Sequence, residues 1–370
     1  MNFDYTPDQR LLKNEARKFL AARCATPVVR GVLDDPGRSH DASLWSQIAD
    51  MGWLGSVVPE EHGGLGLGHV ELCVIAEELG RALAPVPFAS TVYFFAQALM
   101  LGGSHAQRAA WLAPLSQGKV IGCFAAAEGA GEALPPVPRV QATDGRLYGD
   151  KMPVVDGGIA DAAIVLACEG PDASLFLVDL RGDGVERAAL ASLDPSRDLA
   201  RVSFSGAAAD RLGPRGQGLA LARQVLDRAA SLLAFEQLGG ADRCLEMATS
   251  YALERHAFGR PIASYQAIKH KLADIFVRNQ LARSNAYHAA WALDDGGDAL
   301  PLAAATARIA ACDAYWHASK ENIQIHGGMG FTWEVDAHLY YRRAQQLALA
   351  AGAPHYWKER LVSRLERRQG

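Results

Sequence analysis

Apolar side chains recur at the spacing of one helical face throughout residues 1–117. Thr6 and Pro7 open the first run, with Thr6 as the expected N-cap and Pro7 in the first turn. The same spacing returns in three later segments, at residues 44–51, 70–83 and 90–101. The pattern predicts an N-terminal helical domain over residues 1–117.

Near Lys119 the pattern changes to short apolar or alternating runs separated by Gly, Pro and Asp, which is typical of antiparallel strands. These runs lie at residues 120–127, 146–151, 162–167, 174–179 and 200–204. After Gly216 long helical patterns return, at residues 218–255, 265–293, 300–326 and 337–350 and from Pro354 onward. The order predicts an α+β protein with a middle antiparallel β domain at residues 118–212 and a C-terminal helical domain at residues 213–370.

The bulk composition narrows the class of protein. Lys+Arg 37 against Asp+Glu 41 gives a net charge of −4, which argues against a nucleic-acid-binding surface. The chain has neither an apolar run of transmembrane length nor a charged-then-apolar leader, so we expect no membrane span and a cytoplasmic location. Six scattered cysteines without a Cys-x-x-Cys pair indicate buried, reduced thiols rather than a disulfide or zinc framework.

Three glycines follow the helical pattern that ends near residue 326, in the motif Gln324-x-x-Gly327-Gly328-x-Gly330. Glycine permits positive φ and close approach to the backbone, and the Gln324 amide lies one turn earlier, which suits a polar or phosphorylated ligand. Taken alone, the segment is better explained as a helix C-cap. A second glycine-rich loop, at residues 59–68, follows no strand, which disfavours a dinucleotide-binding loop there.

The string Arg-His-Ala-Phe-Gly-Arg-Pro-Ile at residues 255–262, followed by Gln266, resembles the acyl-CoA dehydrogenase family. The string Pro-Glu-Glu-His-Gly-Gly at residues 59–64, the glycine motif and the domain order carry the same resemblance across nearly the whole chain. It implies the family fold, with a C-terminal four-helix bundle, and an FAD flavoprotein that oxidises an acyl-CoA thioester. In this family a base, usually glutamate, takes a proton, the flavin takes a hydride, and electrons pass to an electron-transferring flavoprotein.

The residues with which the family holds the ADP half of FAD across a dimer interface are present. Arg255 supplies a planar fork of donors for a pyrophosphate, although an isolated arginine more often forms a surface salt bridge. Phe258 offers an apolar face, and Gly327-Gly328 would let the cofactor press against the backbone. The cofactor-binding residues that the resemblance implies are Arg255, Phe258, Gln266, Gln324, Gly327 and Gly328.

The residues that the family places around the flavin ring and the thioester are replaced. Ala127 and Val155 stand where hydroxyl side chains are usual, and neither can donate a hydrogen bond to the ring. The two positions at which family members carry the base are Ala351 and Ala229, and alanine cannot take a proton. Ala230 replaces an arginine that lies near the thioester end of CoA.

Three carboxylates are candidates for a substitute base. Glu236 lies about two helical turns after Ala229 in an apolar stretch, which would bury it in part and raise its pKa. Glu334 and Asp336 follow the glycine motif. For all three, a hydrogen-bonded or solvated carboxylate is the more ordinary interpretation.

The hypothesis from sequence is the base-lacking subunit of a heteromeric, FAD-dependent acyl-CoA dehydrogenase. Its partner would be a homologous subunit that carries the glutamate, in an α2β2 assembly, and the pattern resembles bacterial enzymes that act on bulky steroid-type CoA thioesters. Two alternatives stay open. One is a self-sufficient homo-oligomeric flavoenzyme with a substitute base or base-free elimination, and the other is a catalytically silent scaffold.

Overall fold

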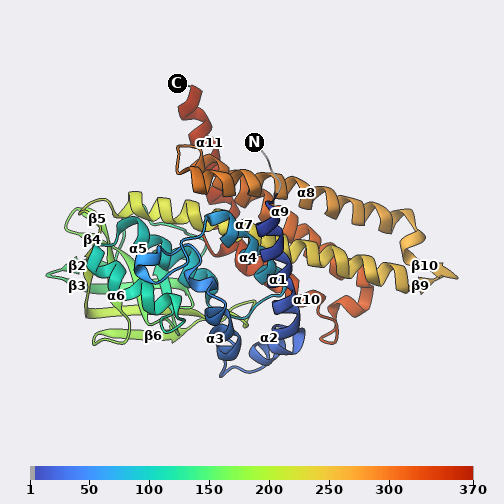
Figure 1. The fold of residues 1–370 in the computed structure, drawn as a ribbon, viewed down its shortest axis with the longest axis horizontal. Coiled ribbons are helices and arrows are strands. Elements are labelled where there is room, and N and C mark those ends of the chain that lie inside the picture. The colour runs from blue at the N-terminus through green and yellow to red at the C-terminus, as the bar shows by residue number, and fades with distance from the viewer. Residues whose placement is uncertain (1–4, 370) are drawn as a thin grey trace.

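The structure, a computed structural model, describes residues 5–369 and the side chains of residues 5–366. The chain begins with a layer of helices (Figure 1). Thr6 caps the first of them as predicted, because its hydroxyl accepts from the Gln9 amide at 3.2 Å and the Gln9 side chain accepts from the Thr6 amide at 3.0 Å. This layer comprises α1 (Pro7–Arg23), α2 (Thr26–Leu33), α3 (Ala42–Asp50), the turns η1 (Trp53–Gly55) and η2 (Glu60–His62), α4 (His69–Arg81), the π-helix η3 (Ala89–Ala96), α5 (Gln97–Gly102) and α6 (His105–Ser116).

A twisted sheet follows, eight-stranded among the described residues, in the order β6-β7-β3-β2-β4-β5-β8 with β1 beside β4. All five predicted strands are present, and three further strands of this sheet, β2, β6 and β8, were not predicted. The strands are β1 (Gly122–Ala125), β2 (Gln141–Thr143), β3 (Arg146–Val155), β4 (Ala162–Glu169), β5 (Asp172–Asp179), β6 (Val185–Ala189), β7 (Leu199–Ala208) and β8 (Asp210–Leu212).

The predicted antiparallel sheet also contains two parallel pairings. Strands β1 and β2 both pair with β4 in parallel, while the other pairings are antiparallel. Parallel neighbours require a long connection, and residues 126–161, which include the β2–β3 hairpin, supply it between β1 and β4. The sheet is therefore mostly antiparallel rather than wholly so.

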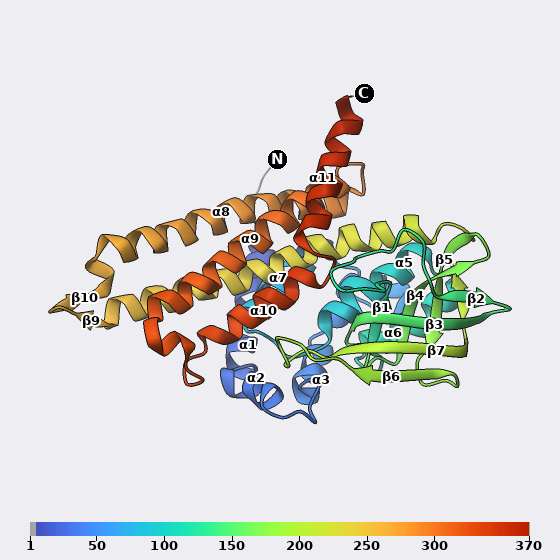
Figure 2. The same cartoon turned by 180° about the vertical axis from the view of Figure 1, so that it is seen from behind.

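The C-terminal part is helical, and its long helices run beside one another while α11 projects away from them (Figure 2). The predicted helices are confirmed to within a few residues, and the predicted domain boundaries fall in the connections after α6 and after β8. The elements are α7 (Gly218–Glu254), the hairpin β9 (His256–Ala257) and β10 (Arg260–Pro261), the turn η4 (Ile262–Ser264), α8 (Gln266–Asp295), α9 (Leu300–His326), the turn η5 (Gly327–Phe331), α10 (Ala337–Leu349) and α11 (Pro354–Gln369).

Helix α7 connects the two ends of the molecule. Its 37 residues extend about 55 Å, from the sheet to the β9–β10 hairpin (Figure 1). It crosses α4 at a pair of glycines. A Cβ on Gly80 would lie 1.8 Å from the backbone carbonyl oxygen of Glu236, and a Cβ on Gly239 would lie 1.8 Å from the backbone carbonyl oxygen of Glu77. No side chain fits at either position, so this crossing depends on glycine.

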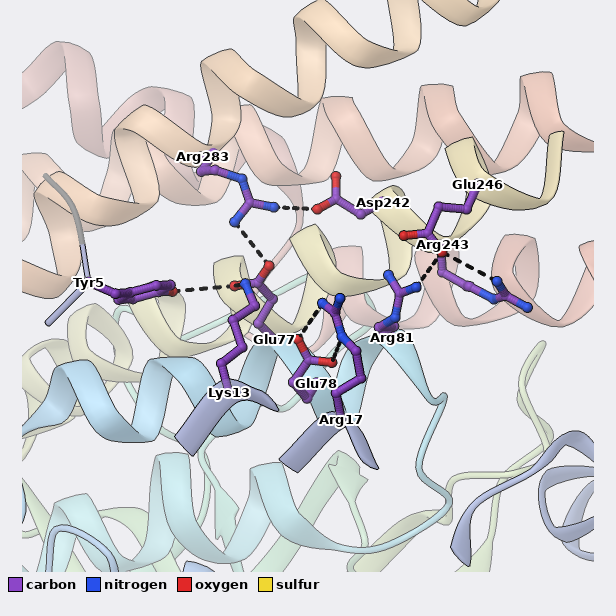
Figure 3. A network of polar contacts seen from close by, with 10 residues as sticks. All are labelled: Tyr5, Lys13, Arg17, Glu77, Glu78, Arg81, Asp242, Arg243, Glu246 and Arg283. Atoms are coloured by element: carbon purple, nitrogen blue, oxygen red, sulfur yellow. Dashed lines mark hydrogen bonds and ion pairs between the residues drawn. The ribbon is translucent and has the colours of Figure 1, made fainter. Parts of the chain in front are cut away.

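A network of ion pairs holds α1 and α4 against the C-terminal helices (Figure 3). The buried Glu77 carboxylate lies 2.8 Å from the Lys13 ammonium and 2.9 Å from the Arg283 guanidinium. Burial alone would raise the pKa of Glu77, but Arg283 and Lys13 hold it below its usual value. The neighbouring Glu78 accepts two hydrogen bonds from Arg17.

The expected thiols are confirmed, since all six cysteines are free and buried. No helix in the described part of the chain is long and apolar enough to cross a membrane.

Candidate functional site

A cavity of about 430 Å³ opens between the sheet, η3, the start of α7 and the end of α10. Most of its wall is apolar, with Phe94, Phe124 and Leu226 among the larger side chains. Ala127, Val155 and Ala351 all line it, although they are far apart in sequence. The fold thus gathers three of the positions at which the sequence departs from the family pattern. The other two, Ala229 and Ala230, are fully buried in α7 and are not part of this wall.

A buried ion pair supports the wall beside Ala127. Lys151 Nζ lies 2.6 Å from a Glu128 carboxylate oxygen and donates to the Ala126 carbonyl at 3.1 Å. Burial lowers the pKa of Lys151 to about 8, while the hydrogen bond to Glu128 opposes that change. The Glu128 carboxylate also accepts from the backbone amides of Arg139 and Val140. These groups bind one another, so they fix the shape of the wall rather than reach into the cavity.

The hydroxyl of Ser90, a lining residue, donates to the Asp156 carboxylate at 2.6 Å. Burial raises the pKa of Asp156 to about 6, although Arg197 nearby acts in the opposite direction. Nothing in the sequence pointed to this pair, because Ser90 lies in a helical pattern and Asp156 at the end of a strand.

The loop at residues 190–193 lines the cavity as well, and the Arg342 guanidinium holds it by donating to the Leu193 carbonyl at 2.9 Å. Two further lining residues, Gln345 and Gln346, have buried side-chain amide atoms without a hydrogen-bond partner. Sequence reasoning missed both glutamines. The sequence feature that could have predicted them is the pair of adjacent glutamines shortly before Ala351.

Glu236, a candidate for the substitute base, lies in an ion pair rather than in the cavity wall. Its carboxylate is buried, lies 2.8 Å from the Arg197 guanidinium and 4.0 Å from that of Arg343, and is not part of the cavity wall. A carboxylate held between two arginines away from the cavity is placed for structure rather than for proton transfer. The Asp336 carboxylate also forms an ion pair, 2.8 Å from the Arg30 guanidinium. Glu334 is exposed to solvent.

The residues predicted to bind the cofactor lie elsewhere, around the hairpin at the far end of α7 (Figure 1). We call this region the hairpin end: residues 255–266 and 324–331. Phe258 is 96% exposed and Phe331 is 79% exposed. The side chains of Arg255, Gln266 and Gln324 are exposed and make no hydrogen bond or ion pair within the described residues.

A ring contact joins the two segments of the hairpin end. Tyr251, in the last turn of α7, stacks on His326 at the end of α9, with ring centroids 4.3 Å apart. The Tyr251 hydroxyl also lies 3.9 Å from the Met329 sulfur. The structure therefore places the arginine string and the glycine motif side by side, as the resemblance implies.

The glycine motif combines a cap with an open backbone. Gly327 caps α9 with a φ of 62°, so the C-cap interpretation holds for this residue. At Gly328 φ is not positive, and an added Cβ would meet nothing within 4 Å. Packing inside the chain does not require glycine at position 328, which leaves that backbone open to a group from outside.

The two regions differ in how they suit FAD. The hairpin end offers a free guanidinium, two free amides, an exposed ring and open backbone, which suit a pyrophosphate and a nucleotide base. In the cavity wall, Ala127 and Val155 offer no side-chain donor to a flavin ring, and the unpaired amides are those of Gln345 and Gln346. The residues at the hairpin end are therefore chemically suited to the ADP half of FAD.

Comparison with known proteins agrees with the family resemblance of the sequence motifs. Residues 6–119 match the acyl-CoA dehydrogenase N-terminal domain, and residues 216–365 match the acyl-CoA dehydrogenase C-terminal domain. The chain is 34% identical over 361 residues to acyl-CoA dehydrogenase IpdE2 of Mycobacterium tuberculosis, which covers 96% of this chain and 97% of that protein.

Two solved structures share the whole fold. The ChsE4-ChsE5 complex from Mycobacterium tuberculosis aligns with a TM-score of 0.90 at 29% identity, over 99% of both chains. A variant of the Tcur3481-Tcur3483 steroid ACAD aligns with a TM-score of 0.88 at 29% identity, over 97% of this chain and 98% of that chain. The chain belongs to the acyl-CoA dehydrogenase family, whose members are FAD-dependent oxidoreductases. The predicted family, fold and flavin cofactor are thereby confirmed.

Proposed function

We propose that this chain is the base-lacking subunit of a heteromeric, FAD-dependent acyl-CoA dehydrogenase. Its hairpin end would complete the FAD site of a homologous partner subunit that carries the catalytic glutamate. The observation that carries the proposal is the contrast within one chain: free polar side chains at the hairpin end and Ala127, Val155 and Ala351 around the cavity.

The exposure of the hairpin end supports a partner. Burying a phenylalanine side chain contributes roughly 1.5–3 kcal/mol, and Phe258 and Phe331 forgo most of this in the chain alone. Phe258 also has a φ of 52°, a conformation that is unusual for a bulky residue. A partner surface and a cofactor that cover these rings would offset both costs.

Each residue of the hairpin end has a role in this proposal. Arg255 would neutralise and orient the pyrophosphate, and Gln266 and Gln324 would satisfy polar groups of the nucleotide. Gly328 would let the cofactor lie against the backbone. When bound, FAD supplies the two-electron oxidation of the acyl-CoA, and a carboxylate of the partner would accept the proton.

The related structures support the heteromeric form and the class of substrate. One is a two-component complex and the other is named as a steroid ACAD. We infer a bulky, steroid-type acyl-CoA as substrate, an electron-transferring flavoprotein as acceptor, and a cytoplasmic location.

The test is to purify the full chain alone and together with a homologous subunit that carries the glutamate. We expect little FAD and no dehydrogenation of acyl-CoA by the chain alone, and both FAD and activity in the complex. Stoichiometric FAD and turnover by the chain alone would instead establish a self-sufficient flavoenzyme. A complex that is fully active after Arg255, Gln266 and Gln324 are all changed to Ala would establish a scaffold.

A further inference from the structure

A second concave site lies on α7, outside both regions described above. This cavity, of about 440 Å³, is bounded by the early turns of α7, the loop that joins α8 to α9, and α11. We call it the α11 cavity. It shares no lining residue with the cavity around Ala127, and the proposed function makes no use of it. Its polar and charged lining residues are Gln224, Asp227, Arg228, Asp298 and Arg364.

Arg228 is a half-buried cation without a carboxylate partner. Its Nη1 makes two long contacts, 3.4 Å to Gln97 Oε1 and 3.3 Å to His69 Nε2. Within the described residues, no carboxylate oxygen lies within ion-pair distance of Arg228, and its Nε and Nη2 have no acceptor. Burial lowers the pKa of Arg228, and the more distant Asp294 only partly opposes this. A guanidinium in this position favours an anion from outside the chain.

The neighbours of Arg228 orient it without neutralising it. His69 Nδ1 lies 3.1 Å from Asp294 Oδ1, which also accepts from the His69 backbone amide at 2.8 Å. If Nδ1 carries the proton toward Asp294, Nε2 is left as an acceptor for Arg228. Gln97 supplies a second neutral acceptor on the same nitrogen. The guanidinium is thus held at Nη1, while Nε and Nη2 keep their hydrogens available for a ligand.

The remaining charges around the cavity leave it cationic. Asp227 is neutralised by Arg360, whose nitrogen lies 2.8 Å from its carboxylate. Arg364 and Asp298 also line the cavity and bring one charge of each sign. The positive charge of Arg228 is therefore the one that these lining residues leave without a counterion.

We propose that the α11 cavity binds a compact oxyanion, a carboxylate or a phosphate group, through the Nε and Nη2 edge of Arg228. These two nitrogens present parallel donors at the spacing of two oxyanion oxygens. The cavity also has room for a small molecule that carries the anion. The site needs neither FAD nor a partner subunit, so its test is independent of the proposed function.

The experiment measures the thermal unfolding midpoint of the full chain as inorganic phosphate or succinate is added at constant ionic strength. A ligand that binds only the folded state raises this midpoint in a saturable way. We expect a saturable rise with at least one of the two anions. A rise with phosphate alone assigns a phosphate ligand, a rise with succinate alone assigns a carboxylate ligand, and a rise with both supports the shared chemistry.

Variants separate the proposed contact from general ion effects. Arg228→Gln should abolish the saturable rise, and Arg228→Lys should weaken the apparent affinity about tenfold, because an ammonium keeps the charge but loses the fork. Arg223→Gln removes an exposed arginine of the same helix outside the cavity wall and should bind as the unchanged chain does. If Arg228→Gln does not fold, the Lys variant decides the matter. No saturable rise in the unchanged chain, or equal binding by the Arg228 variants, would overturn the proposal.

Discussion

The cavity around Ala127 and the hairpin end lie on the same long helix, but their charged groups are used differently. In the interior of the chain, Lys151 binds Glu128 beside the cavity and Glu236 binds Arg197 away from it, and all four residues are buried and paired. At the hairpin end, the Arg255 guanidinium has no partner in the described structure and is exposed. The comparison teaches that buried charges neutralise one another within the chain, whereas the Arg255 charge at the hairpin end is open to a group from outside. Substitutions in buried pairs should therefore change the stability of the chain alone, and those at the hairpin end should act only in the complex.

The largest effect is expected at the buried carboxylate of Figure 3. Glu77→Gln leaves Lys13 and Arg283 without their buried counterion, and we expect a loss of about 3–5 kcal/mol in the free energy of unfolding. Urea unfolding of the chain alone measures this. Glu15→Gln, which breaks the exposed pair with Lys18, is the control and should cost under about 0.5 kcal/mol. Equal losses in the two variants would remove the distinction between buried and exposed charges.

The next effect concerns Asp156, whose folded-state pKa of about 6 lies above its ordinary value of 3.8. A raised folded-state pKa stabilises the protein fully below about pH 4, and that contribution is lost as the pH rises through about 6. The difference of about 2 pKa units corresponds to about 3 kcal/mol. Asp156→Asn should remove this part of the pH dependence, because an amide oxygen can still accept from Ser90.

Urea unfolding of both proteins at several pH values between about 4 and 7, the range that spans the two pKa values, measures the difference. The unchanged chain should lose stability relative to the Asn variant as the pH rises across this range. Parallel pH profiles for the two proteins would show that Asp156 ionises normally in the folded chain.

Arg255→Ala should weaken FAD binding by the complex about 10- to 100-fold, the cost of losing hydrogen bonds from a charged group. The unfolding free energy of the chain alone should stay unchanged, because Arg255 has no partner there. Flavin absorbance after equilibrium dialysis gives the occupancy. Arg201→Ala, at an exposed ion pair on β7, is the control and should leave FAD binding unaffected. If the Arg255 variant, measured without a partner subunit, were less stable than the unchanged chain, Arg255 would have a role in folding instead.

The smallest effect is expected in the cavity itself. Val155→Leu narrows a cavity that the proposed function does not use, and kcat/KM of the complex should change by less than about twofold. Phe258→Ala, which removes the exposed ring at the hairpin end, should lower kcat/KM by more than the cavity variant does. The reverse order would place the chemistry in this chain's own cavity and favour the self-sufficient enzyme.

Local patterns were enough to predict most helices and five of the eight strands described in the large sheet. The capping box at Thr6 and the 3.6-residue spacing are properties of neighbouring residues, so the sequence displays them directly. Strands β2 and β8, of three residues each, are too short to show alternation, and parallel pairing of β1 with β4 depends on residues about forty positions apart. The sequence did not predict the Ser90–Asp156 and Arg228–His69 contacts for the same reason, because the two residues of each pair come from different elements.

Glu236 is the clearest example of a contact that local sequence cannot predict. Its position in an apolar stretch predicted partial burial, and the structure buries it almost fully. Its partner Arg197 comes from the loop before β7, so the sequence of α7 does not predict the pair. Burial follows from local composition, whereas the charge that neutralises a buried group comes from wherever the fold brings one.

The sequence by itself determined the family, the order of the domains, the flavin cofactor of the family and the alanines at the usual base positions, because each is a matter of residue type and spacing. Only the tertiary structure decided which of these residues meet. It gathers Ala127, Val155 and Ala351 around one cavity and brings the arginine string beside the glycine motif at the opposite end of α7. The physical reason is that hydrogen bonding, ion pairing and close packing act over a few ångströms in space, whatever the separation of the residues along the chain.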